Sequence, residues 1–250
     1  MQIVGYETAS DGGDAGLFLA GDGVERVSLA PGTDLRYTLG ERHCAGTVRD
    51  GEHAPCPADR APYCRDHTST WACARCTGDC DRPLDACREE HAVYLAAFAP
   101  DVFKVGVTRS WRLETRLREQ GADRAAHVRT VADGRRARRI EAELARDLTD
   151  RVRVPTKVDG LHQSVDDDAW AALLADFDAI ETFDFAYGLD LDDRPVLETL
   201  ATGTVRGTKG RVLVLDREGS SYAVDLRDLV GYEVRRGATD RSLQSSLGAF

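Results

Sequence analysis

This chain of 250 residues has very little lysine. Only Lys104, Lys157 and Lys209 are lysines, although Lys and Arg together number 33. The chain also lacks an apolar run long enough to cross a bilayer, which argues against a membrane-spanning helix. Its N-terminus lacks a basic stretch followed by an apolar one, so we expect no secretory signal peptide. These absences predict a cytoplasmic protein.

Charge is unevenly distributed along the chain. Asp and Glu number 43, and the formal net charge is −10. This acidic, lysine-poor composition resembles that of haloarchaeal proteins, in which acidic surfaces maintain solubility at high salt. Residues 104–153, however, contain 14 Lys and Arg against 8 Asp and Glu, a local charge of +6. Such a segment indicates a polyanion partner such as DNA or RNA, and a surface of Arg–Glu pairs is the alternative.

Residues 44–91 contain few apolar side chains, so they cannot form a hydrophobic core alone. They hold all seven cysteines, and Cys73 and Cys76 have the C-x-x-C spacing that lets two ligands reach one ion. We expect about two zinc ions, held by Cys44, Cys56, Cys64, Cys73, Cys76, Cys80, Cys87 and His91. His67 is the second choice for the eighth ligand. One zinc ion with spare thiols, disulfides, and an iron–sulfur cluster are the alternatives.

The middle of the chain alternates strand and helix patterns. Two apolar runs flank a Pro-Asp turn and predict a hairpin, and helical spacing of apolar residues follows. The predicted elements are strands at 92–98 and 102–107, a helix at 111–120, a strand at 125–131 and a helix at 135–150. This order places four reactive side chains on one side of a three-stranded sheet: Tyr94, Lys104, Arg116 and Glu141. The set suits phosphodiester chemistry, because arginine neutralises phosphate charge, a carboxylate holds a divalent metal, and tyrosine or lysine moves a proton.

The same segments resemble the GIY-YIG nuclease superfamily. Ala92–Tyr94 and Lys104–Gly106 match its two signature strands, Arg116 matches its arginine, and the run from Ala137 to Leu144 matches its metal-binding segment. The resemblance implies a three-stranded antiparallel sheet with flanking helices. The motifs HAVYLA, KVGVTR and TRLREQGA, with the upstream cysteines, more closely resemble a prokaryotic family of unassigned function.

The nuclease resemblance also implies roles for the four residues. Glu141 would bind Mg²⁺ or Mn²⁺, Arg116 would stabilise phosphate charge, and Tyr94 would act as the base towards a water, with Lys104 assisting or replacing the missing tyrosine. Lys104 stands where the family has its second tyrosine, and Gln120 where it often has a histidine. An ordinary lysine beside arginines is protonated at neutral pH, so Lys104 favours slow cleavage or none.

Both ends of the chain have strand patterns. We expect an N-terminal β segment (1–43), part of which, 15–39, packs with strands from 196–236 in a small β-barrel-like unit. The segment 152–195 reads as a linker followed by an amphipathic helix at 167–182, and 237–250 as a tail. The sequence GTVRGTKG at 203–210 reads either as a basic contact segment or as an edge loop. The basic residues expected to contact nucleic acid are Arg109, Arg112, Arg135, Arg139, Lys209 and Arg211.

Together these patterns predict an α+β protein with a zinc segment, a GIY-YIG-like core (92–151) and a terminal β unit. The expected function is nucleic-acid binding, with metal-dependent phosphodiester cleavage as its catalytic form. A non-catalytic RNA- or DNA-binding module is one alternative. A protein adaptor that acts through the C-terminal β unit is another.

Overall fold

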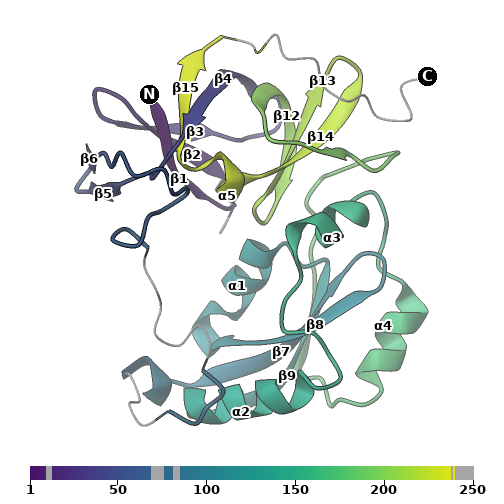
Figure 1. Cartoon of the computed structure of the whole chain (residues 1–250). Coiled ribbons are helices and arrows are strands. Elements are labelled where there is room, and N and C mark those ends of the chain that lie inside the picture. Colours follow the sequence, from purple (N-terminus) through teal and green to yellow (C-terminus); the bar gives the residue numbers. More distant parts are fainter. Residues whose placement is uncertain (10–12, 69–75, 81–84, 238, 240–250) are drawn as a thin grey trace. The chain divides into compact units, whose positions relative to one another are not determined.

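The computed structural model in Figure 1 describes residues 1–9, 13–68, 76–80, 85–237 and 239. The chain divides into two compact units, Met1–Ser69 with Tyr187–Phe250, and Thr70–Ala186. The boundary falls inside the predicted zinc segment. Cys44, Cys56 and Cys64 therefore lie in the first unit, and the later cysteines belong to the second. No described helix is long and apolar enough to cross a membrane.

The first unit contains a nine-stranded sheet with the order β11-β14-β13-β12-β4-β15-β1-β2-β3. Its strands are β1 (Gln2–Glu7), β2 (Gly16–Ala20), β3 (Val24–Ser28), β4 (Asp34–Arg42), β11 (Val196–Leu197), β12 (Ala201–Lys209), β13 (Val212–Arg217), β14 (Ser220–Asp225) and β15 (Tyr232–Arg236). The described strands do not close into a barrel, so the barrel-like expectation is corrected. At one edge β11 has two residues, and at the other β3 carries Glu25 and Arg26, features that discourage further pairing. A short hairpin, β5 (Thr47–Arg49) with β6 (Glu52–Ala54), and helix α5 (Leu226–Leu229) complete the unit.

The sheet interleaves strands from both ends of the chain. β4 pairs with β12 and with β15, and β15 pairs with β1. The GTVRGTKG segment is therefore an interior strand and not an edge loop. Gly203 in this strand has φ +142, and a Cβ there would lie 2.9 Å from the carbonyl oxygen of Asp216. Glycine thus allows β12 and β13 to approach closely at this point.

The second unit contains a four-stranded antiparallel sheet with the order β10-β9-β7-β8. Its strands are β7 (His91–Phe98), β8 (Val102–Arg109), β9 (Arg124–Val131) and β10 (Glu181–Asp184). Its helices are η1 (Asp85–Arg88), η2 (Ser110–Arg112), α1 (Leu113–Gln120), α2 (Gly134–Leu144), α3 (Val154–Asp159) and α4 (Asp167–Leu174). β8 is an edge strand of this sheet, so one of its sides has no neighbouring strand among the described residues and can interact with side chains from other elements.

Three elements differ from the sequence prediction. The helix expected at 135–150 ends at Leu144, and the expected linker contains α3, whose first turn accommodates Pro155. The helix expected at 167–182 ends at Leu174, and after a short turn region β10 (Glu181–Asp184) forms a fourth strand. Phe183 of β10 is partly buried against the core cluster that contains Leu117 of α1, so tertiary contact and not helical spacing determines the structure of this segment.

Side chains alternate along β7, so apolar residues of this strand point to both faces of the sheet. Helices pack against each face and bury them. Val93 and Leu95 belong to a core cluster that includes residues of α2 and α4. Tyr94 and Phe98 point to the opposite face and pack with Leu117 of α1. This alternation places Tyr94 on the side of the sheet that α1 covers.

Candidate functional site

Three cysteines and one histidine converge in the first unit. Ligand atoms of Cys44, Cys56, Cys64 and His67 all lie within 4.8 Å of one another. The Sγ atoms of Cys56 and Cys64 are 4.0 Å apart, and His67 Nδ1 lies 3.4 Å from Cys44 Sγ and 3.2 Å from Cys64 Sγ. Ligands bound to one tetrahedral zinc ion at about 2.0–2.3 Å are separated by less than about 4 Å. The Cys₃His cluster therefore fits a metal such as zinc.

Hydrogen bonds favour the thiolate form at two of the three cysteines of this cluster, Cys44 and Cys64. The backbone N–H of Cys64 donates to Cys44 Sγ over 3.2 Å, and that of Gly46 donates to the same sulfur over 3.4 Å. Burial raises the pKa of Cys64, but hydrogen bonds from the backbone and ring of His67, together with those of the Asp66 backbone and Cys44, outweigh this and lower the pKa to about 7. Because zinc binds the thiolate, this environment favours metal binding.

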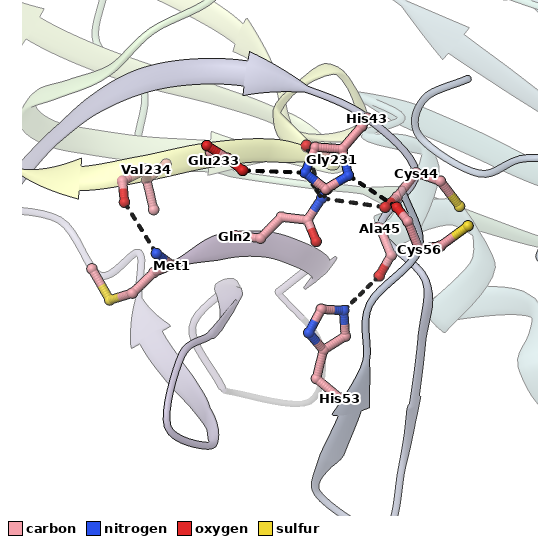
Figure 2. Close-up of polar contacts among 10 residues, drawn as sticks. All are labelled: Met1, Gln2, His43, Cys44, Ala45, His53, Cys56, Gly231, Glu233 and Val234. Carbon is pink, nitrogen blue, oxygen red and sulfur yellow. Dashed lines mark hydrogen bonds and ion pairs between the residues drawn. The ribbon is translucent and has the colours of Figure 1, made fainter. Parts of the chain in front are cut away.

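A second layer of contacts ties the ligand-bearing segment to the sheet (Figure 2). The buried carboxamide of Gln2 donates to the carbonyl oxygens of Cys44 and Gly231 over 3.3 and 3.0 Å. A ring nitrogen of His43 hydrogen-bonds the Cys56 carbonyl oxygen over 3.0 Å, and His53 contacts the Ala45 carbonyl oxygen over 2.9 Å. Two ligand residues are thus held through their backbones by neighbouring polar side chains.

The fourth residue of the cluster is His67, the second choice from the sequence. His91 lies in the other unit, where its Nδ1 hydrogen-bonds the Glu89 carbonyl oxygen over 2.8 Å. Cys73 lies outside the described residues. Cys76, Cys80 and Cys87 are described, but the Cys₃His cluster is the one group of possible ligands that converges among the described residues. The partition of the remaining predicted ligands therefore stays a prediction.

A basic pocket of about 620 Å³ lies along β8 in the second unit. Tyr94, Lys104, Arg116 and Glu141, the four residues expected to act on a phosphodiester, all line it. The described lining includes seven cationic and two anionic side chains, namely Lys104, Arg109, Arg112, Arg116, Arg135, Arg138, Arg151, Glu141 and Asp150. An excess of fixed positive charge in a hollow concentrates anions there.

A glycine lets Tyr94 reach this pocket from the interior of the sheet. Tyr94 and Gly106 are directly opposed on β7 and β8. A Cβ at Gly106 would lie 2.5 Å from the Tyr94 Cζ and hydroxyl oxygen, so a larger residue would displace the ring. The Gln120 Nε2 donates to the Tyr94 hydroxyl over 2.6 Å, and Lys104 Nζ donates to Gln120 Oε1 over 2.9 Å. Gln120 therefore joins the tyrosine to the lysine.

Burial lowers the pKa of Lys104 and raises the pKa of Tyr94, and both shifts favour the neutral form of the side chain. Burial lowers the pKa of Lys104, Arg116 adds to the effect, and Glu141 and Asp150 oppose it, which leaves the pKa at about 8. Burial raises the pKa of Tyr94, and the nearby Arg116 opposes this shift. Tyr94 is thus a neutral hydroxyl at physiological pH, whereas Lys104 loses its proton far more readily than an ordinary lysine.

Ion pairs hold several of the charged groups. Arg138 Nη1 donates to Glu141 Oε2 over 2.6 Å, with side chains 19% and 14% exposed. The carboxylate of Glu119 accepts from Arg112 over 2.8 Å and from Arg116 over 3.1 Å. Pairing with shared carboxylates reduces the repulsion between neighbouring arginines and orients them around the pocket.

The residues expected to contact nucleic acid fall into two groups. Arg109, Arg112 and Arg135 line the pocket. Arg139 is not part of the described lining, and its Nε lies 3.6 Å from Asp79. The other two belong to the first unit: Lys209 is buried, and Arg211 pairs with Asp225 over 2.9 Å.

Some residues of the pocket were missed from the sequence. Arg138 lies three residues before Glu141 on α2, so helical spacing alone could have indicated their proximity. Thr149 forms a β-bridge with Lys104 at the edge of the sheet, and this brings the neighbouring Asp150 to the pocket. No local sequence pattern indicates that contact. Gln120 was noted only as a departure from the nuclease pattern.

A comparison with models of known families gives a match. A model of the family described as "Protein of unknown function (DUF2797)" matches residues 32–194. This match covers more than half of the chain and parts of both units. No curated protein and no solved structure matches the chain. The family match assigns no nuclease activity.

Proposed function

The chain belongs to the DUF2797 family, and we propose that its basic pocket binds the phosphodiester backbone of a nucleic acid and cleaves it with the help of a divalent metal ion. One observation carries this proposal: Tyr94, Lys104, Arg116 and Glu141 line one pocket. These four residues are well separated in the sequence. Their convergence supports a shared chemical role.

The charge of the pocket supports binding of a phosphate backbone. Among the described residues, seven cationic and two anionic side chains line it, and five of these cations are arginines of η2, α1, α2 and the neighbouring β8 end. Arginine presents several N–H donors in a plane that matches phosphate oxygens. In a chain with a formal net charge of −10, such a concentration of arginine favours a polyanionic ligand.

The shifted pKa values support specific roles in cleavage. With a pKa of about 8, Lys104 is neutral often enough near physiological pH to accept a proton from an attacking water. Tyr94 accepts a hydrogen bond from Gln120, so its own O–H proton is available to a phosphate oxygen. Arg116 stabilises negative charge on the non-bridging oxygens. Lys104 therefore replaces Tyr94 as the proposed base.

Glu141 and Asp150 provide the donor set for a divalent metal. Both carboxylates line the pocket. Mg²⁺ is commonly held by one or two carboxylates together with substrate phosphate oxygens, so the residues fit such an ion. When bound, the ion would neutralise charge on the reacting phosphate. Glu141 is the expected ligand, and Asp150 is a second carboxylate of the same pocket.

The test compares cleavage of labelled DNA and RNA by wild type and Glu141→Gln, with Mg²⁺ or Mn²⁺ present. We expect the variant to fold normally. Its cleavage rate should fall by a factor on the order of a hundred or more, because a metal ligand is lost. Glu143→Gln is the matched control. It makes the same chemical change at an exposed position two residues along the same helix, and we expect wild-type activity.

A second pair of variants tests charge stabilisation. Arg116→Ala should reduce cleavage strongly, whereas Arg118→Ala should not, because Arg118 pairs with Glu114 and is absent from the described lining.

Equal activity in Glu141→Gln and wild type would contradict metal-dependent cleavage. Absence of both binding and cleavage in wild type would refute the proposed function as a whole.

The ion pair of Arg138 with Glu141 favours a second candidate, a non-catalytic nucleic-acid-binding module. The carboxylate expected to hold metal is already neutralised at 2.6 Å by an arginine of the same helix. In such a module, wild type binds nucleic acid but cleaves none with any divalent metal. Binding is then insensitive to Mg²⁺ beyond the general effect of ionic strength.

A further inference from the structure

An exposed tryptophan stands beside the basic pocket. Trp111 lies in η2, between β8 and α1, and its side chain is 70% exposed. A single exposed apolar residue is common on protein surfaces and by itself indicates nothing. The contacts of Trp111 distinguish it from such a residue.

The orientation of the indole ring is fixed by its neighbours. Its Nε1 donates to Glu89 Oε2 over 3.1 Å, and the other oxygen of Glu89 lies 3.5 Å from Arg109. The ring is therefore held in place while most of its surface faces solvent. A pre-oriented aromatic surface loses little conformational entropy when it binds a flat ligand.

Two cations of the pocket flank the ring. The guanidinium carbons of Arg109 and Arg112 lie 5.7 and 5.9 Å from the Trp111 ring centroid, and both arginines line the pocket. An aromatic surface beside phosphate-binding cations is the combination that binds single-stranded nucleic acid: the cations contact the backbone and the ring stacks on a base.

We propose that Trp111 stacks on an unpaired base of the nucleic acid whose backbone occupies the pocket, so that the ligand is single-stranded at this point. This inference rests on the proposed function, because the same strand supplies the phosphates and the base. Bases within an intact duplex already stack on each other and cannot offer a free face to a side chain. The cationic surroundings favour nucleic acid over a protein segment as the occupant.

The test measures binding by fluorescence anisotropy, with three labelled probes of equal length: a single strand, its duplex, and an abasic strand that retains the phosphates but lacks bases. Trp111→Leu removes the aromatic ring, and Trp111→Phe keeps a ring but loses the hydrogen bond to Glu89. We expect Trp111→Leu to weaken binding of the single strand about ten- to a hundredfold. Binding of the abasic strand should be unchanged, and Trp111→Phe should retain most of the wild-type affinity.

Other outcomes separate the two proposals. If wild type binds none of the probes, the proposed function itself fails. If wild type binds but Trp111→Leu has wild-type affinity for the single strand, the stacking inference fails alone, and a protein contact becomes the better explanation of the exposed ring. Equal losses for the abasic and the normal strand, or equal losses in the Phe and Leu variants, would also overturn stacking. Such losses would indicate a structural role through Glu89.

Discussion

The Cys₃His cluster of the first unit and the basic pocket of the second gather polar side chains under opposite conditions. In the cluster, four ligand atoms lie within 4.8 Å of one another, in a segment with few apolar residues. In the pocket, the described part of the chain places seven cations and two anions around a cavity beside a well-packed sheet. The ligands of the cluster would be held together by a shared ion, whereas the cations of the pocket repel one another.

This difference indicates what holds each group of polar side chains in place. We expect residues 44–67 to depend on a metal for part of their stability, because few apolar side chains lie in this segment. The pocket instead depends on the strands and helices that position its charges, and it costs free energy until an anion binds. On this account a bound metal would stabilise the segment 44–67 of the first unit, whereas in the second unit the fold holds the charged site in place. Variants in the two sites should therefore change stability in opposite directions.

The largest expected effect is the loss of structure on metal removal. Elemental analysis of the reduced protein should find at least one zinc ion per chain. A strong chelator should unfold residues 44–67, because a structural zinc ion contributes on the order of 10 kcal/mol to folding. Hydrogen exchange of this segment before and after chelation measures the effect. Unchanged protection after complete metal removal would contradict it.

Variants of two histidines test which ligands form the cluster. His67→Ala should expose the thiols of Cys44, Cys56 and Cys64 to alkylation, whereas His67→Cys should keep them protected by supplying a replacement thiolate. His91→Ala is the control, since His91 belongs to the other unit and should leave these three thiols protected. Protection lost in His91→Ala but not in His67→Ala would restore the ligand choice favoured by the sequence.

The next effect concerns Lys104, whose replacement should stabilise the protein while abolishing cleavage. Its pKa is about 8 in the folded protein and near 10.5 when unfolded, so the unfolded state binds more protons between these pH values. Stability should therefore rise with pH across this window, and the cost of the buried charge is present in full below pH 8. Lys104→Met should raise the free energy of unfolding by about 2 kcal/mol at pH 7 and flatten the pH dependence.

Urea unfolding at pH 7 and pH 9.5 measures this change, and cleavage assays measure the accompanying loss of activity. In wild type, the cleavage rate should increase as pH rises towards 8, because the neutral amine is the active form. A less stable Lys104→Met variant, with the pH dependence of unfolding retained, would show that the lysine has a structural role instead.

The smallest effect concerns individual arginines. Arg112→Gln or Arg135→Gln should weaken nucleic-acid binding and reduce its salt slope by about 0.7–0.9, the value for one lost phosphate contact. Arg139→Gln should change the slope little, because Arg139 pairs with Asp79 and lies outside the described lining. Arg211→Gln, in the first unit, serves as a further control. Equal effects at all four positions would indicate diffuse electrostatic attraction.

Local patterns were sufficient to predict much of the second unit. The hairpin of β7 and β8 follows from two apolar runs around a turn, and α1 ends where Gly121 adopts φ +67, as a terminal glycine predicts. The clustering of Tyr94, Lys104, Arg116 and Glu141 followed from the order of the elements. The hairpin and the end of α1 depend on residues near one another in the sequence, whereas the clustering of the four side chains depends on the order of the elements.

Other features depend on contacts between distant residues and had no local signal. His67 and His91 both follow cysteines at short spacing, so spacing could not choose between them. β10 forms only because β9 offers an edge and Phe183 fills a core position. The low pKa of Lys104 arises from burial in the tertiary structure, which its sequence neighbours do not reveal.

The most direct test of the proposed pocket is hydrogen–deuterium exchange of wild type with and without a short single-stranded oligonucleotide. Binding in the pocket should slow exchange in peptides covering 102–116 and 134–151, and leave 201–212 unchanged. Protection confined to 201–212, or absent from the pocket peptides despite measured binding, would contradict the assignment of the nucleic-acid site.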